Sequence, residues 1–277
     1  MNDKTRNIER TIVIDAEPDV VWRALTEARE LMRWFPPHAE VQPGVGGTID
    51  LTWDPAEATT PCRVIEWEPG QHLRMSWRDE PDGEHPLPVD IRLESRDGRT
   101  VLRLVHSGFL TDASWDDDFE SHGRGWSYEL RSLKYYLEHY FGRDRHVLRM
   151  RFPITGDAKE TWRSLVGEQG LFRVSTLSTL AEGADFMLQL PSGDFTSARM
   201  FHQLADHDFA AIADVLQGGI FRFALETTFG QPEVWIWLLS WHLVESQLEG
   251  LMDRWVQDIT ETLGSPSLET QSGKLNI

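Results

Sequence analysis

The chain contains two copies of a strand followed by a helix, and this repeat limits its fold more than any other feature. Residues 12–14 (IVI) precede Pro18 and residues 22–25 (WRAL). The pattern returns 140 residues later, as residues 152–154 (FPI) followed by residues 162–165 (WRSL). Self-similarity at this spacing indicates copies of one structural unit, and a chain of 277 residues fits two domains better than one.

Each copy also ends in a segment with the spacing of an amphipathic helix. The first stripe consists of Trp126, Leu130, Leu133, Leu137 and Tyr140, and Gly142 follows it. The second stripe consists of Val244, Leu248, Leu251, Trp255 and Ile259, and Gly264 follows it. Steps of three and four place such residues on one helical face, and glycine commonly ends a helix. We therefore predict domains at 1–143 and 144–264 and a polar tail at 265–277, with helix starts near Asp15 and Thr155 in the two copies.

Between its two helical ends the first copy alternates apolar and polar residues. The apolar faces are Ile49, Leu51 and Trp53; Leu73, Met75 and Trp77; Val89, Ile91 and Leu93; and Leu102 and Leu104 with His106. Alternation of this kind is typical of antiparallel strands with one face in water, and Asp97-Gly98 is a hairpin signal. The amphipathic helix has to cover the apolar face of the sheet. The prediction is an α+β fold of two helix-grip domains, each a curved antiparallel sheet wrapped around a long C-terminal helix with an apolar cavity between them.

The second copy alternates less regularly. Residues 221–225 alternate, but residues 234–241 (VWIWLLSW) are apolar on both faces. We infer that the outer face of this strand, with Trp235, Trp237 and Trp241, meets the other domain or a partner chain; a core rich in tryptophan explains it almost as well. Local propensity favours a helix at 206–216, whereas the repeat requires a strand there.

A family resemblance rests on residues spread through the first copy. They are Pro18, Val21-Trp22, Ala24-Leu25-Thr26, Trp34-Phe35, Gly46-Gly47, Val64-Ile65-Glu66, Pro69, Leu73, Trp77, Thr100-Val101-Leu102-Arg103-Leu104, His106, Gly108-Phe109, Gly125-Trp126, Leu130, Leu133 and Leu137. In these residues the first copy resembles the activator-of-Hsp90-ATPase-homologue branch of the START/Bet v 1-like (SRPBCC) superfamily, and the second copy resembles it at its two ends. The resemblance implies a deep pocket. It does not imply one chemistry, because the superfamily includes carriers, cyclases, sensors and chaperone cofactors.

The two-domain layout is similar to that of START-like proteins of polyketide and enediyne biosynthesis. That analogy implies a polyketide or linear polyene ligand and a role as a biosynthetic accessory or sequestration protein. Two other functions remain open: a cofactor-independent polyketide aromatase/cyclase, and an Hsp90-type co-chaperone. The expected partners are a hydrophobic small molecule and a biosynthetic enzyme.

Composition argues against several other classes. The net charge is −18, with −11 from residues 1–142 and −7 from the remainder, so we expect neither nucleic acid nor a membrane surface as a partner. Cys62 is the single cysteine, which rules out an intramolecular disulfide or a cysteine zinc cluster. The N-terminal residues contain no apolar signal segment, so we expect a cytoplasmic protein. The metalloprotease, hydrolase and phosphate-loop motifs are absent from the sequence, and we expect no cofactor and no metal.

The candidate ligand-binding residues are the inward apolar positions of both copies. They are Trp53, Leu73, Met75, Trp77, Ile91, Leu93, Leu104, His106, Trp126, Leu130, Leu133, Tyr140, Phe221, Phe223, Trp237, Leu248 and Trp255. His106 shares the parity of Leu102 and Leu104, so it is the first candidate for a polar contact or a general base, although a buried structural histidine is the simpler explanation. Residues 116–118 (DDD) are expected in the loop before the first closing helix, where they have too few companions to bind calcium.

Overall fold

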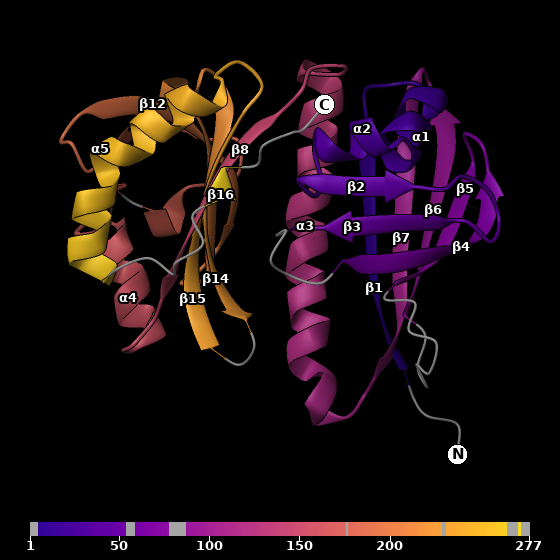
Figure 1. The fold of residues 1–277 in the computed structure, drawn as a ribbon, viewed down its shortest axis with the longest axis horizontal. Helices are drawn as coiled ribbons and strands as arrows, with labels where there is room; N and C mark the ends of the chain where they lie inside the picture. The colour runs from indigo at the N-terminus through magenta and orange to yellow at the C-terminus, as the bar shows by residue number, and fades with distance from the viewer. Residues whose placement is uncertain are drawn as a thin grey trace. The chain divides into compact units, whose positions relative to one another are not determined.

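The computed structural model of the protein describes residues 5–53, 59–77, 87–175, 177–228, 231–264 and 271–272. The chain divides into two compact units, Met1–Asp144 and Arg145–Ile277. Figure 1 draws the first in indigo to magenta and the second in rose to yellow. Apart from Gln271–Ser272, the predicted tail 265–277 lies outside the described residues.

The described residues of the first unit form a seven-stranded antiparallel sheet and three α-helices. The strands are β1 (Thr5–Ile14), β2 (His38–Val41), β3 (Thr48–Thr52), β4 (Thr60–Glu68), β5 (His72–Trp77), β6 (Leu87–Arg96) and β7 (Arg99–Leu110). The helices are α1 (Pro18–Thr26), α2 (Ala28–Met32) and α3 (Asp116–His139), with one 3-10 turn at Ala113–Trp115. The strand order is β1-β7-β6-β5-β4-β3-β2, so the chain's first strand pairs with its last.

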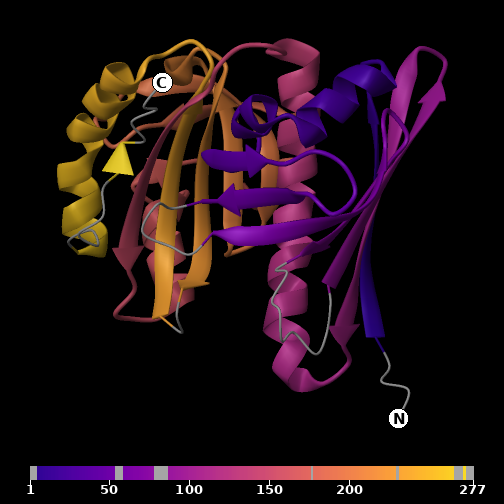
Figure 2. The same cartoon turned by 45° about the vertical axis from the view of Figure 1, so that its right-hand side comes forward.

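The sheet of this unit curves strongly around α3. In Figures 1 and 2, β2 and β3 run across the direction of β1 and β7. Asp97 and Gly98 both have positive φ, 53° and 75°, which gives β6 and β7 the tight hairpin that their sequence predicts. The apolar faces predicted for β3, β6 and β7 are the buried faces; in β5 the predicted apolar face is buried, and so are His72 and Ser76 of the opposite face.

Helix α3 begins ten residues before the predicted stripe at Trp126. The expectation that residues 116–118 form a loop is therefore wrong, since Asp116, Asp117 and Asp118 make up the helix's first turn. Carboxylates are stabilised there because the helix dipole places positive charge at the N-terminus. Asp116 also pairs with Arg6 at 2.6 Å. Two other helix starts also differ from their expected positions. They were expected near Asp15 and Thr155, whereas the N-caps of these helices are Glu17 and Asp157.

In the part of the second unit that the structure describes, the same topology recurs in a sheet of nine strands. They are β8 (His146–Pro153), β9 (Val166–Gly167), β10 (Phe172–Arg173), β11 (Asp185–Gln189), β12 (Phe195–Leu204), β13 (Asp208–Ala213), β14 (Gly219–Thr228), β15 (Gln231–Ser240) and β16 (Gln271–Ser272). The order is β16-β8-β15-β14-β13-β12-β11-β10-β9, so β8 pairs with β15 as β1 pairs with β7. All pairings are antiparallel except the short β9–β10 pair.

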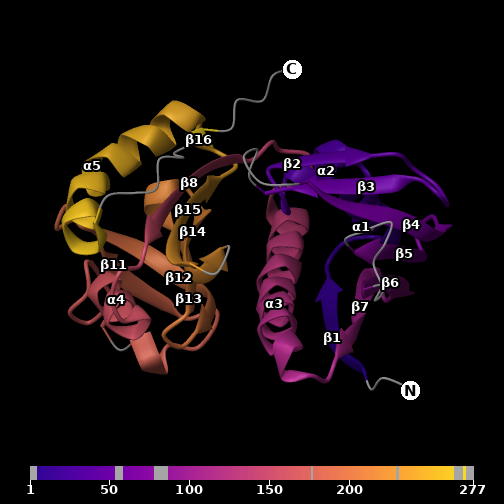
Figure 3. The ribbon, with the colours of Figure 1, turned by 60° about the horizontal axis from the view of Figure 1, so that its bottom comes forward.

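Two helices cover one face of this second sheet. They are α4 (Ala158–Leu165) and α5 (Glu245–Leu263), with 3-10 turns at Leu177–Thr179 and Asp214–Leu216. Figure 3 shows α4 and α5 on the same side of the strands. Asp157 caps α4 by accepting a hydrogen bond from the Glu160 amide at 2.9 Å. Both units thus have the α+β helix-grip fold, with a curved antiparallel sheet against a long C-terminal helix.

The structure also shows which conformation residues 206–216 adopt, which the sequence left ambiguous between helix and strand. Residues 208–213 form β13, as the repeat requires, and only Asp214–Leu216 turn helically. Ladders to both β12 and β14 satisfy the backbone of β13, so tertiary pairing overrides the local helix propensity. Among the described residues, no helix is long and apolar enough to cross a membrane.

Candidate functional site

The first unit contains an apolar cavity between its sheet, α3 and the segment from α1 to α2. Its volume is about 20 Å³. The described side chains that line it are Leu25, Leu31, Trp34, Phe35, Ile49, Leu51, Leu73, Met75, Ile91, Leu104, Trp126 and Leu130. A cavity of this volume holds about one water molecule, far less than a drug-sized ligand occupies.

The sheet wall of the cavity follows from strand register. Leu73 pairs with Ile91, and Ile91 pairs with Leu104, so these three side chains form one row across β5, β6 and β7. Met75 lies in the next row, with Val89 and His106. Since side chains alternate between the two faces of a strand, both rows point inward.

The helical wall is aromatic, with Phe35 at its centre. The Phe35 ring stacks on Trp34 at 4.9 Å and on Trp126 at 5.7 Å between centroids. It meets the edge of Trp53 at 5.3 Å and lies 6.5 Å from Trp77. Offset and edge-on pairs at these distances are favourable beyond simple area burial, so the cluster has a defined geometry.

Two of the lining side chains carry a nitrogen atom, and each nitrogen is already hydrogen-bonded to another group of the protein. The Trp34 indole Nε1 donates to the Ala24 carbonyl at 2.8 Å. The Trp126 Nε1 donates to Nδ1 of His106 at 3.0 Å. The lining side chains described above therefore present hydrocarbon, aromatic carbon and the Met75 thioether to the cavity, and no free N–H or O–H group.

His106 is fully buried directly behind Trp126. Because an indole N–H can only donate, Nδ1 of His106 accepts, which places the proton of the neutral ring on Nε2. The ring packs against Phe109 at 4.8 Å, His122 at 5.1 Å and Trp77 at 5.7 Å. His106 thus positions Trp126 and lies one row away from the lining row of Leu104.

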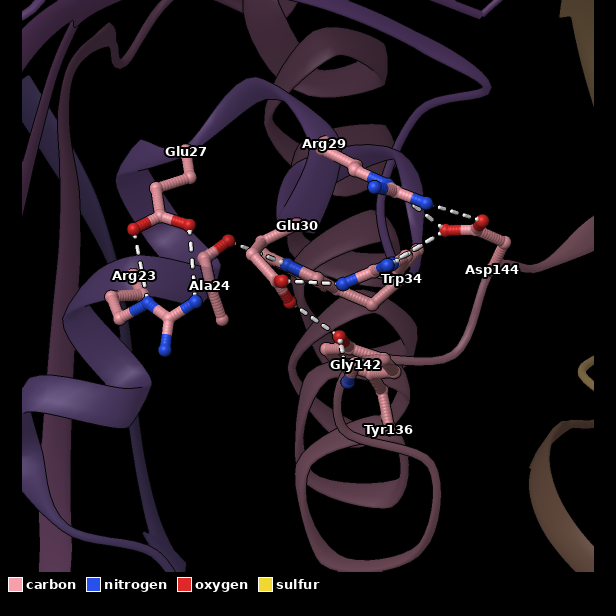
Figure 4. A network of polar contacts seen from close by, with 10 residues as sticks. Arg23, Ala24, Glu27, Arg29, Glu30, Trp34, Tyr136, Gly142 and Asp144 are labelled. Atoms are coloured by element: carbon pink, nitrogen blue, oxygen red, sulfur yellow. Dashed lines mark hydrogen bonds and ion pairs between the residues drawn. The ribbon is translucent and has the colours of Figure 1, made fainter. Parts of the chain in front are cut away.

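A charged cluster with a buried centre holds α2 against the end of α3 (Figure 4). Glu30 and Arg33 are 4% and 7% exposed, and Arg33 Nη1 donates to Glu30 Oε1 at 2.5 Å. The Tyr136 hydroxyl donates to Oε2 of Glu30 and accepts from the Gly142 amide at 2.9 Å. Asp144 accepts from Arg29 at 2.8 Å and from Arg33 at 2.9 Å. We call Glu30, Arg33, Tyr136 and Asp144 the Glu30 cluster.

The surroundings of these groups shift their proton affinity. Burial, reinforced by the hydrogen bond to Glu30, raises the pKa of Tyr136 to about 12. The hydrogen bond from Arg29, supported by Arg33, lowers the pKa of Asp144 below its ordinary value. The phenol therefore stays a donor and the Asp144 carboxylate stays charged across the neutral range.

The sequence-predicted site residues of the first unit fall into three groups. Six of them line the cavity: Leu73, Met75, Ile91, Leu104, Trp126 and Leu130. Trp53, Trp77 and His106 lie behind this lining, in the aromatic cluster. Leu93 and Leu133 are buried outside the lining, and half-buried Tyr140 caps α3 beside Tyr135.

Six lining residues were not among the predicted site residues. They are Leu25, Leu31, Trp34, Phe35, Ile49 and Leu51. Ile49 and Leu51 share the strand parity of Trp53, so the alternation already contained that signal. Leu31, Trp34 and Phe35 belong to a helix of five residues and the turn after it, which are too short for a periodic pattern.

In the second unit the corresponding residues make a packed aromatic core. Phe221 and Phe223 lie 4.3 Å apart between ring centroids, and Phe172 lies 4.9 and 4.6 Å from them. The ring of Trp255 in α5 packs edge-on against Phe172 and Phe221, with 5.8 Å between ring centroids in each pair. Leu248 belongs to the same core. Trp237 instead lies on the opposite face of β15, beside Trp235 and Arg149.

The described residues include no group of three or more His, Cys, Asp or Glu side chains arranged to hold a metal ion. The imidazole rings of His106 and His122 lie 5.1 Å apart between centroids, behind the cavity lining. Nothing in this donor set indicates a particular cofactor.

Comparison with solved structures gives partial similarities. The Aha1 dimer from Colwellia psychrerythraea is 26% identical over 50% of this chain and 99% of its own, with a TM-score of 0.42. CalU16 from Micromonospora echinospora is 25% identical over 49% of this chain and 78% of its own, with a TM-score of 0.40. DynU16, described as a protein in the dynemicin biosynthetic locus, is 17% identical over 93% of this chain and 96% of its own, with a TM-score of 0.42.

Comparison with curated protein sequences gives no match. The family model described as Activator of Hsp90 ATPase homolog 1-like protein matches residues 15–138. That stretch runs from the end of β1 almost to the end of α3, and it includes every residue that lines the cavity. Over these residues the first unit is therefore similar to the Activator of Hsp90 ATPase homolog 1-like protein family.

Proposed function

We propose that the first unit binds the hydrocarbon part of an apolar small molecule, of the linear polyene or reduced polyketide type, and holds it without turnover. The observation that carries this proposal is the cavity lining, in which both nitrogen-bearing side chains are already hydrogen-bonded within the protein. The polyene and polyketide classes come from the family resemblance of the sequence. The role is that of an accessory or sequestration protein that receives its ligand from a biosynthetic enzyme.

The physical argument concerns what such a cavity can tolerate. Each square ångström of apolar surface removed from water contributes about 25 cal/mol, so a hydrocarbon chain gains affinity along its whole buried length. A carbonyl buried without a donor costs roughly 1–3 kcal/mol. A poly-β-ketone carries a carbonyl on every second carbon, so several such costs would accumulate in this cavity.

The same argument weighs against the aromatase/cyclase alternative. A cyclase has to polarise carbonyls and move protons, which needs donors and a base at the ligand. Here His106 is the nearest base, and its Nδ1 is occupied by Trp126. Co-chaperone activity, the third alternative, is supported by the family description alone.

The test is a fluorescence titration with N-phenyl-1-naphthylamine, a neutral apolar probe whose emission rises on burial. We expect saturable binding at one site, with competition by 1,3-diphenylpropane. The matched dione is 2,2-dimethyl-1,3-diphenylpropane-1,3-dione, whose quaternary carbon prevents enolisation and keeps both carbonyls free. We expect it to compete less well than its octanol–water partition coefficient alone predicts. Absence of saturable binding rejects the proposal, and preferential binding of the dione favours the cyclase.

A further inference from the structure

The cavity is too small for the ligand that the proposed function requires, so one of its walls has to move. About 20 Å³ accommodates roughly one water molecule. Three structural parts form the lining: the sheet, α3, and the segment from α1 to α2. These three parts differ in how firmly their backbones are tied to the rest of the unit.

Two of these walls are tied into the body of the unit. Leu73, Ile91 and Leu104 lie on central strands, each hydrogen-bonded to a strand on both sides. Leu130 and Trp126 lie in the middle of the 24-residue helix α3. Moving either wall breaks many backbone hydrogen bonds at once.

The third wall is short and bounded by two backbone breaks. Residues 28–35 carry Leu31, Trp34 and Phe35, three of the lining side chains. At one end, Glu27 is extended, with φ −97° and ψ 125°, and it alone separates α1 from α2. At the other end, Pro36 and Pro37 cannot continue a helix. This segment can therefore turn as a unit about its two ends.

Polar contacts hold this segment closed (Figure 4). Glu30 and Arg33 lie within it, and they bind Tyr136 and Asp144 outside it. The Ser132 hydroxyl of α3 adds a bond to the Trp34 carbonyl at 2.9 Å. Charged groups regain hydration when they separate, which offsets part of the loss of these contacts on opening. The hydrocarbon face of Leu31, Trp34 and Phe35 that opening exposes is covered again by an apolar ligand.

We propose that residues 28–35 are the gate through which the apolar ligand reaches the cavity, and that the Glu30 cluster is the latch that holds the gate shut. This inference rests on the proposed function. Because the bound ligand keeps the gate displaced, a weaker latch should let the ligand enter faster and bind more tightly, while the dissociation rate changes little.

The kinetic test uses the full-length protein and N-phenyl-1-naphthylamine in stopped flow. In the wild type, the observed association rate reaches a plateau at high probe concentration, because gate opening becomes limiting. Asp144 is half exposed, so Asp144→Asn loosens the latch with little risk to folding. We expect the plateau to rise about threefold to fivefold, the range for losing one partly exposed ion pair, and the dissociation constant to fall by a similar factor, with the dissociation rate changed less than twofold.

The matched control is Asp185→Asn in the second unit. Asp185 pairs with Arg199 at 2.7 Å, and that hydrogen bond lowers its pKa as Arg29 lowers that of Asp144. The control removes an ion pair of the same chemistry, so its rates should equal those of the wild type. If Asp144→Asn has the rates of the control, the gate proposal is wrong while the binding proposal stands; if the wild type does not bind the probe, the binding proposal fails first.

Hydrogen exchange of the wild type gives a second measurement that needs no variant. The Trp34 indole N–H donates to the Ala24 carbonyl, outside the gate, at 2.8 Å, so opening of the gate breaks this bond. We expect it to exchange at least tenfold faster than the Trp126 indole N–H, which donates to His106 at 3.0 Å within the body of the unit. Equal protection of the two indoles would overturn the proposal.

Discussion

At the scale of single residues, two buried hydrogen bonds decide what the cavity can offer a ligand. The Trp126 to His106 bond removes an indole donor from the lining and fixes the imidazole tautomer. The Trp34 to Ala24 bond removes the second donor. The polar groups nearest the cavity therefore shape its wall and leave an apolar surface.

Tyr136 gives a pH prediction at the same scale. Its pKa is raised to about 12 in the folded protein, so its contribution to stability is complete below its ordinary pKa of about 10 and is lost as the pH rises through about 12. Tyr136→Phe has no such proton. We expect the wild type to exceed the variant in unfolding free energy by roughly 2–3 kcal/mol at pH 8 and by progressively less between pH 10 and 12.

Urea titrations of both proteins from pH 8 to 12 measure this difference. Ultraviolet absorbance of tyrosinate reports the ionisation separately. A difference between the two proteins that stays constant over that pH range would contradict the assignment of this proton to the Glu30 cluster.

At the scale of elements, α3 makes two different contributions along one stripe. Leu130 lines the cavity and is 2% exposed, while Leu133, nearly one turn later, is fully buried outside the lining. We expect Leu130→Ala and Leu133→Ala each to destabilise the protein by about 2–5 kcal/mol. Only Leu130→Ala enlarges the existing cavity, so only this variant should bind N-phenyl-1-naphthylamine severalfold more tightly in equilibrium titrations.

An equal change in probe affinity for both leucine variants would mean that the ligand does not enter beside Leu130. It would also mean that helix stability, rather than cavity volume, controls binding. Thermal unfolding with and without the probe separates the two effects, because a ligand stabilises the folded state only through its own affinity.

The elements that sequence could predict are those with a period. The stripe of α3 and the alternation of β5 to β7 predicted six of the twelve lining residues. The turn of Asp116–Asp118 was placed in a loop because an acidic first turn has no apolar period, although helix-dipole electrostatics favours it. Leu31, Trp34 and Phe35 were not predicted as site residues, because tertiary contacts rather than local pattern place them at the cavity.

At the scale of the whole molecule, one topology supports two kinds of core. Both sheets pair the first strand of the unit with the last long strand, and both units close with a long helix. The repeat in the sequence predicted that both units contain an antiparallel sheet and a closing helix. It did not predict the pairing of the first strand with the last long strand, because that contact joins residues far apart in the sequence. It could not predict that large rings would pack against one another in the second unit, since that depends on how side-chain volumes fit in three dimensions.

This difference in cores gives a prediction about where the ligand binds. Phe35 of the first unit and Phe223 of the second are both buried aromatic residues, so Phe35→Leu and Phe223→Leu are the same chemical change in the two cores. We expect each to cost up to about 2 kcal/mol in unfolding free energy. Phe35→Leu removes a ring from the cavity wall and should change the affinity for N-phenyl-1-naphthylamine severalfold, whereas Phe223→Leu should leave it within twofold of wild type. If Phe223→Leu shifts the affinity as much as Phe35→Leu, the packed core of the second unit opens to ligands, and binding has to be assigned to both units.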